Sequence, residues 1–102
     1  SYQDQVNEIT KENEIKTVNY RIQSTMHDLK NADSGQARIE LPEKVGGTDY
    51  RVVLDNNIRL ITAEKEYIHR IQNFQRSEVS GSVEGREVIL YKSGNQYTLR
   101  SS

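Results

Sequence analysis

The chain has 102 residues, and its fourteen Lys and Arg are balanced by fifteen Asp and Glu, giving a formal net charge of −1. This balance argues against a nucleic-acid partner, because such surfaces are strongly basic and the sequence contains no run of Lys and Arg. Only 33% of the residues are hydrophobic, which is below the usual share for a globular domain. The composition predicts one domain with a thin core and some surface left for a partner.

Cysteine is absent, which excludes a disulfide framework and a thiolate zinc site. No stretch is apolar enough for a signal peptide or a membrane span. The chain opens inside a helical pattern with no capping residue. We therefore expect a longer protein whose N-terminal segment has been removed, with Ser1 left by cloning.

Residues 2 to about 30 have the apolar spacing of an α-helix. Apolar side chains recur every three or four positions, which places them on one stripe. The segment 31–35 predicts the end of the helix, with Gly35 in the left-handed conformation. We expect the stripe to pack the helix on a sheet, through Ile15, Val18, Ile22, Met26 and Leu29.

The first turns of this helix carry a second apolar stripe. At 100° per residue, Tyr2, Val6 and Ile9 point roughly opposite to the longer stripe. One interpretation is a frayed tail with incidental apolar residues. The other is that these turns project from the domain and form a subunit contact.

From Gln36 onward the sequence predicts short antiparallel strands. Ala37, Ile39 and Leu41 alternate with polar residues. Further strands are expected, separated by tight turns, at 50–54, 57–62, 79–83, 87–92 and 96–99. Residues 63–76 fit either a short helix or a strand, and the enrichment in Tyr and Ile favours the strand.

No pattern of chemistry-bearing residues identifies an active site. His27 is expected on the polar side of the helix, and His69 is expected to face solvent from a sheet. The two lack the spacing of metal ligands, and Asp55-Asn-Asn57 is explained by a hairpin turn. No nucleophile motif or phosphate-binding loop occurs. We therefore expect no catalytic, cofactor-binding or metal-binding residue, and no enzyme.

Two passages carry a resemblance to a known family. An alternating strand ending in Leu-Pro, residues 38–42, is followed by Val45-Gly-Gly47 and by a Tyr-led strand at 50–53, and a Val-Ser-Gly-Ser-Val passage opens residues 79–90. This layout resembles the soluble domains of archaeal type IV pilin-like proteins, which carry a class III signal peptide. The apolar processing and membrane helix of that family does not occur in the sequence.

The resemblance implies a structural function. The expected fold class is α+β, with a long N-terminal α-helix packed on a small antiparallel β-sheet or β-sandwich of about five to seven strands. Residues 1–34 would be the C-terminal half of a pilin-type helix and residues 35–102 a β-rich head, together one domain. The protein would be a subunit or minor component of a pilus-like filament at the cell surface.

Its expected partners are copies of itself or related pilin-like subunits, with membrane contact only through the missing helix. Two other functions stay open. One is a membrane-anchored extracellular binding or adhesion module, which would show exposed aromatic residues clustered along a groove. The other is an intracellular or phage-derived scaffold protein.

Overall fold

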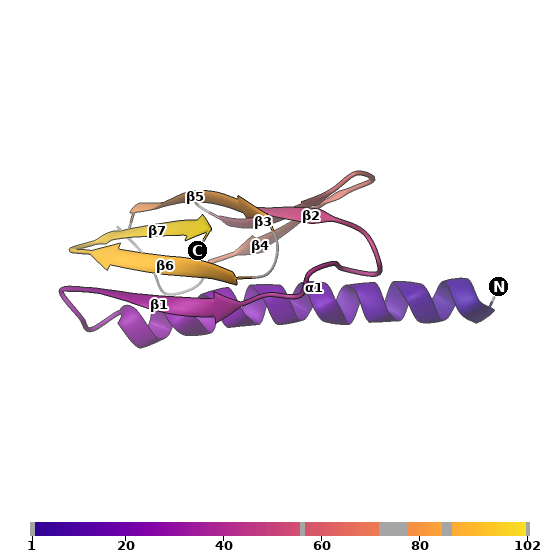
Figure 1. Cartoon of the computed structure of the whole chain (residues 1–102), viewed down its shortest axis with the longest axis horizontal. Coiled ribbons are helices and arrows are strands. Elements are labelled where there is room, and N and C mark those ends of the chain that lie inside the picture. The colour runs from indigo at the N-terminus through magenta and orange to yellow at the C-terminus, as the bar shows by residue number, and fades with distance from the viewer. Residues whose placement is uncertain (1, 56, 72–77, 85–86, 102) are drawn as a thin grey trace.

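The computed structural model describes residues 2–55, 57–71, 78–84 and 87–101, and it describes no side chains for residues 2–9, 78–80 and 82–84. One helix precedes all the strands, and its N-terminal end extends past them (Figure 1). The elements are α1 (Tyr2–Leu29), β1 (Ser34–Glu40), β2 (Tyr50–Leu54), β3 (Asn57–Thr62), β4 (Glu66–Arg70), β5 (Glu78–Glu84), β6 (Glu87–Ser93) and β7 (Gln96–Ser101).

The seven described strands pair in the order β1-β6-β7-β5-β2-β3-β4. Strands β1, β6 and β7 form one antiparallel group, and β2, β3 and β4 form another. Strand β5 joins the groups, since it pairs antiparallel with β2 and parallel with β7. The consecutive strands β1 and β2, β4 and β5, and β5 and β6 are therefore not neighbours in the sheet, and β1 and β4 are its edge strands.

The expected fold class, a long helix packed on one small antiparallel sheet or sandwich, is wrong. The part of α1 with described side chains is the short stretch 10–29, and the strands divide into two small antiparallel groups of three. The parallel pairing of β5 with β7 joins residues on either side of the β6 hairpin. Alternating hydrophobicity identifies strands, but it does not say which strands pair.

The core lies between α1 and one face of the sheet. Alternate residues of the strands point to this face, as period-two patterning requires. It is filled mostly by aliphatic side chains, together with the rings of Tyr50 and Tyr97. The helix contributes Ile15, Val18, Ile22 and Met26, with Leu29 half-buried against the same cluster.

Both edge strands reach back to the helix. The Nη1 atom of Arg21 donates to the backbone oxygen of Glu40 on β1 at 2.5 Å. The Nε2 atom of Gln23 donates to the backbone oxygen of Arg70 on β4 at 3.3 Å. Both edge strands thus contact α1, and no described strand lies over the helix surface between them.

The helix ends without the expected left-handed glycine. The N–H of Lys30 donates to the carbonyl of His27 at 3.2 Å, and the N–H of Ala32 donates to the carbonyl of Leu29 at 3.1 Å. These bonds close the last turn in the tightened form that helix ends often adopt. Gly35 instead lies within β1. The polar run 31–35 marks a helix end, but a strand starts inside it.

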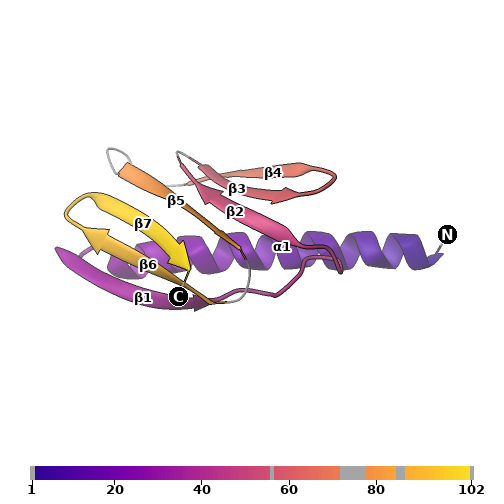
Figure 2. The same ribbon diagram turned by 45° about the horizontal axis from the view of Figure 1, so that its top comes forward.

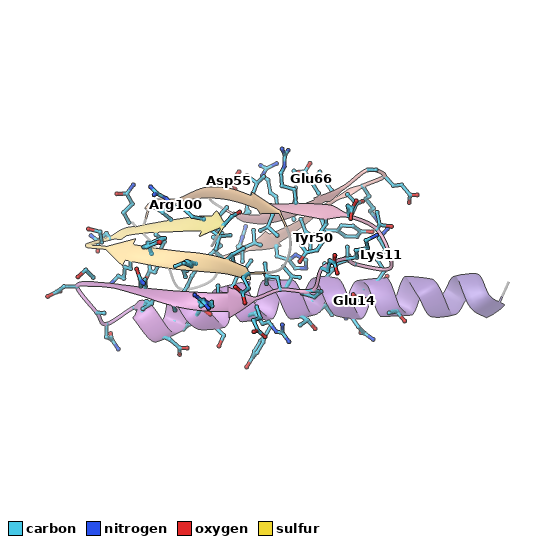
Figure 3. All side chains as sticks on the ribbon, viewed as in Figure 1. Lys11, Glu14, Tyr50, Asp55, Glu66 and Arg100 are labelled. Atoms are coloured by element: carbon cyan, nitrogen blue, oxygen red, sulfur yellow. The ribbon has the colours of Figure 1, made fainter. Side chains whose placement is uncertain are left out.

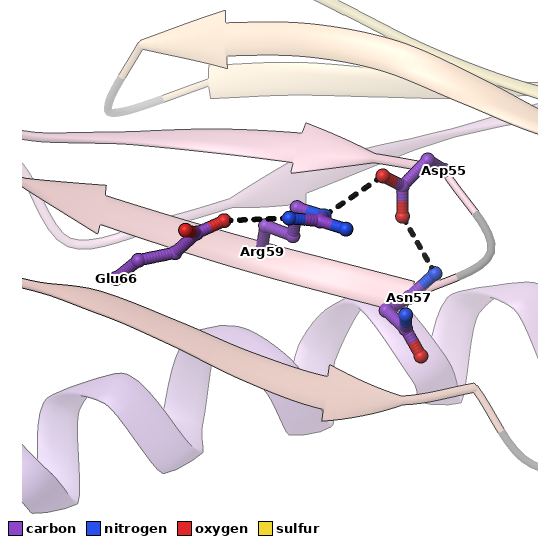
Figure 4. A network of polar contacts seen from close by, with 4 residues as sticks. All are labelled: Asp55, Asn57, Arg59 and Glu66. Atoms are coloured by element: carbon purple, nitrogen blue, oxygen red, sulfur yellow. Dashed lines mark hydrogen bonds and ion pairs between the residues drawn. The ribbon is translucent and has the colours of Figure 1, made fainter.

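The turn between β2 and β3 is held by its own side chains (Figure 4). The Oδ1 atom of Asp55 accepts the N–H of Asn57 at 2.8 Å, and its Oδ2 atom accepts Nε of Arg59, also at 2.8 Å. Arg59 also donates to Oε1 of Glu66 on β4 at 2.9 Å. The Asp55 carboxylate is therefore engaged by the turn, as an Asx-type turn requires.

The strand alternative for residues 63–76 is confirmed over Glu66–Arg70, which forms β4. Tyr67 and His69 are half-buried on the inner face, and Ile68 points outward. Residues 72–76 lie outside the described part of the chain.

Candidate functional site

The N-terminal turns of α1 run past the sheet, which both ribbon views show (Figure 2). Residues 2–10 make about 13 Å of helix at about 1.5 Å per residue. Tyr2, Val6 and Ile9 lie in these turns, but their side chains are outside the described part of the structure. The subunit contact assigned to them from the sequence therefore stays a prediction.

A set of polar contacts surrounds the helix where it leaves the sheet, near Lys11 and Glu14, which Figure 3 labels. Lys11 is only 7% exposed, and its Nζ atom lies 4.0 Å from Oε2 of Glu64 and 5.9 Å from the ring centre of Tyr67. The N–H of Gly46 donates to Oε1 of Glu14 at 3.3 Å. These residues hold the helix at its point of exit. Sequence reasoning missed Lys11, because lysine is seldom buried in full.

The loop between β1 and β2 is fastened to the same region. Val45 is fully buried, and its N–H and carbonyl both bond to Thr48 at 3.0 Å. The hydroxyl of Tyr50 donates to the carbonyl of Pro42 at 2.5 Å. Burial raises the pKa of Tyr50 to about 12, with the nearby Glu14 carboxylate acting in the same direction and the Arg21 guanidinium opposing it. The Leu-Pro and Gly-Gly passage thus packs against the helix.

A groove runs between the exposed flank of α1 and strand β1. We call it the α1–β1 groove, and its polar lining comprises Tyr20, Arg21, Ser24, Thr25, Arg38 and Glu40. A second hollow on the helix shares Tyr20 and Ser24 with it and extends to His27. Tyr20 stands between the two hollows with 70% of its surface exposed. An exposed aromatic residue beside a groove is a common feature of binding surfaces.

The histidines do not form a site together. His27 is exposed on α1, and His69 is half-buried in β4. The expectation that His69 faces solvent is wrong, since its Nδ1 atom is buried and has no hydrogen-bond partner among the described residues. In the described part of the chain, no three His, Asp or Glu side chains gather as a metal site would require.

The exposed aromatic residues are dispersed. Among the described tyrosines, Tyr20 is exposed on α1 and Tyr91 is exposed on the outer face of β6, where Arg100 lies 5.8 Å from its ring centre. Tyr50 and Tyr97 are buried. The aromatic cluster expected of an adhesion module is therefore not seen among the residues that the structure describes.

No protein-family model, curated protein or solved structure matches this chain. Over the described ranges, α1 falls short of the apolarity that a membrane-crossing helix needs.

Proposed function

We propose that this domain is a structural subunit of a cell-surface filament of the type IV pilin-like kind, and that it assembles through the N-terminal turns of α1. One observation carries the proposal: α1 continues past the sheet at its N-terminal end (Figures 1 and 2). A helix with a hydrophilic average composition needs tertiary contacts to be stable in water. The projecting turns would receive such contacts from a neighbouring subunit.

The packing of the described helix residues supports a helix whose second part holds the sheet while its first turns are left for assembly. Ile15, Val18, Ile22 and Met26 are buried against the sheet, and they attach the head to the second part of α1. A contact between the projecting turns of one copy and a different surface of the next would be heterologous, which is the arrangement that produces open filaments.

The proposal is tested by placing a photo-crosslinking amino acid at Val6 in the full protein, in cells that make it. Irradiation should join copies of the protein, or related subunits, in the envelope fraction. The matched control is the same amino acid at Asn95, in the β6–β7 turn, which Figure 1 places at the opposite end of the molecule from the N-terminus. Absence of crosslinks from Val6, or equal crosslinks from Asn95, would overturn the proposal.

A further inference from the structure

Strand β1 is an edge of the sheet, and on its side away from β6 no described strand pairs with it. In its antiparallel pairing with β6, Ser34 lies opposite Ser93. Just outside this pair, the N–H of Gly94 donates to the carbonyl of Asp33 at 2.8 Å. Residues of an antiparallel strand alternate between pairs that exchange hydrogen bonds and pairs that do not. The backbone groups of 33, 35, 37 and 39 therefore face β6.

The remaining residues of β1 present their backbone groups to the side away from β6. These are Ser34, Gln36, Arg38 and Glu40, by the same alternation. The bond from Arg21 to the carbonyl of Glu40 agrees with this direction, because it comes from the helix and not from β6. The N–H and C=O groups of Gln36 and Arg38 are thus placed to pair with a further strand.

The free edge lies beside the α1–β1 groove, so an added strand would rest on the uncovered flank of the helix. Successive side chains of that strand would point to opposite faces. Those on the inner face would meet Tyr20 and Ser24, which line the groove. Those on the outer face would lie next to the exposed side chain of Arg38.

The charges along the α1–β1 groove indicate which side chains the added strand carries. Arg21 and Arg38 line it with one opposing carboxylate, that of Glu40, so the lining carries a net positive charge. An exposed guanidinium pairs well with a carboxylate, which it can bind through two parallel hydrogen bonds. The exposed ring of Tyr20 offers apolar surface to the inner face of the added strand. The complementary segment therefore has an acidic residue on its outer face and aliphatic residues on its inner face.

We infer that the free edge of β1 and the α1–β1 groove bind an extended acidic segment of a partner protein, which adds a strand to the sheet. Addition of a strand at an exposed sheet edge is a recurrent mode of peptide recognition. This inference is independent of the proposed filament function, because it uses a different surface. The partner class is a protein with an extended segment in which a carboxylate side chain stands between aliphatic ones.

A second copy of this chain fits the edge less well. Paired β1 strands of two copies would lie about 4.8 Å apart. Each copy brings its own α1 alongside β1, as the bond from Arg21 to Glu40 requires. Two helices need about 8–10 Å between their axes, so the helices would collide on the inner face.

The test uses the full chain and two fluorescein-labelled heptapeptides, TTVEVTT and TTVKVTT, in fluorescence anisotropy titrations. Both peptides place valines on one face of a strand and the central charged side chain on the other. TTVEVTT should bind at least about tenfold more tightly than TTVKVTT. In NMR spectra, the amide signals of Gln36 and Arg38 should move most on its addition.

One variant tests the backbone pairing at the edge of β1 without changing the rest of the fold. Gln36→Pro removes an N–H that points away from β6, and proline is tolerated at such positions of edge strands. It should weaken TTVEVTT binding by about tenfold or more, whereas Gln36→Ala keeps the N–H and should change the affinity by less than about twofold. A thermal melt of each variant checks that it is folded.

A second variant tests the charge and does not depend on proline. Arg38→Glu should reverse the preference, so that TTVKVTT binds more tightly than TTVEVTT. The inference is overturned if neither peptide binds at about 1 mM, if both bind equally, or if folded Gln36→Pro binds as the parent does. It is also overturned if the parent dimerises through this edge and Gln36→Pro abolishes that dimer, because the occupant would then be a second copy.

Discussion

The Nζ atom of Lys92, on strand β6, lies 2.9 Å from the backbone oxygen of Lys30 at the end of α1. The same ammonium donates to the carbonyl of Ala32, and its side chain is almost fully buried. The C-terminal end of a helix carries a partial negative charge, and both carbonyls lie just beyond the end of α1 at Leu29. A strand lysine therefore caps the helix and ties it to the sheet.

Replacing this lysine should destabilise the domain. Lys92→Met keeps the length of the side chain but leaves two carbonyls without their charged donor, so we expect a loss of about 1–3 kcal/mol in the free energy of unfolding. Lys16→Met, at an exposed position on α1, should change it by less than about 0.5 kcal/mol. Urea denaturation measures both, and equal losses would contradict the capping role.

Gly81 should tolerate no side chain. It lies in β5, opposite Leu54 of β2 and Leu99 of β7. Its φ is +139°, and a Cβ atom there would come within 2.3 Å of the backbone oxygen of Leu99. Gly81→Ala should cost about 3 kcal/mol or more, because backbone strain and a clash combine.

The matched control for that variant is Gly94, which also has a positive φ, of +60°, but whose added Cβ would have nothing within 4 Å. Gly94→Ala should therefore cost only the conformational strain, about 1–2 kcal/mol. In thermal melts, the melting temperature of Gly81→Ala should be well below that of Gly94→Ala. The opposite ranking would argue against the close approach of β5 to β7.

The two faces of α1 should respond differently to truncation. Ile22 is fully buried and Tyr20 is 70% exposed, so Ile22→Ala should cost about 2–4 kcal/mol and Tyr20→Ala less than about 0.5 kcal/mol. Val6→Ala, in the turns that run past the sheet, should also leave the melting temperature of the isolated chain nearly unchanged. If Val6→Ala lowers the melting temperature as much as Ile22→Ala does, the helix is not divided into a packed part and a projecting part.

Tyr50 should make the domain sensitive to alkali. Its folded pKa of about 12 is raised above the ordinary value of 10.0, so the folded state holds the phenol proton more tightly than the unfolded state does. This contribution is fully present below pH 10 and is lost as the pH rises through 12. Between these values, the free energy of unfolding should fall less steeply in Tyr50→Phe than in the parent, as chemical denaturation at a series of pH values can measure. Equal slopes would contradict the burial of this hydroxyl.

Periodicity in the sequence was informative where one face of an element is buried. Ile15, Val18, Ile22 and Met26 share one helical stripe in the sequence, and all four lie in the core. The starts of β2, β3, β6 and β7 followed from alternation and from turn residues in the same way. These are local signals, and each depends on residues close together in the chain.

The pairing of strands and the buried polar groups could not be predicted. The β5–β7 pairing depends on a close backbone approach at Gly81, and a lone glycine in a strand indicates such an approach only weakly. Lys92 resembles a surface lysine in the sequence, because its carbonyl partners come from a segment 60 residues away. The candidate site could not be predicted for the same reason. The sequence suggested a strand over 37–41, but only the order of the strands in the sheet shows that this strand is an edge.

The central claim, assembly of this domain into a surface filament, is tested most directly by immunogold electron microscopy of the cells that make the protein, with antibodies raised against this chain. We predict label along thin surface fibres. Label spread over the envelope without fibres, or confined to the cell interior, would contradict the claim.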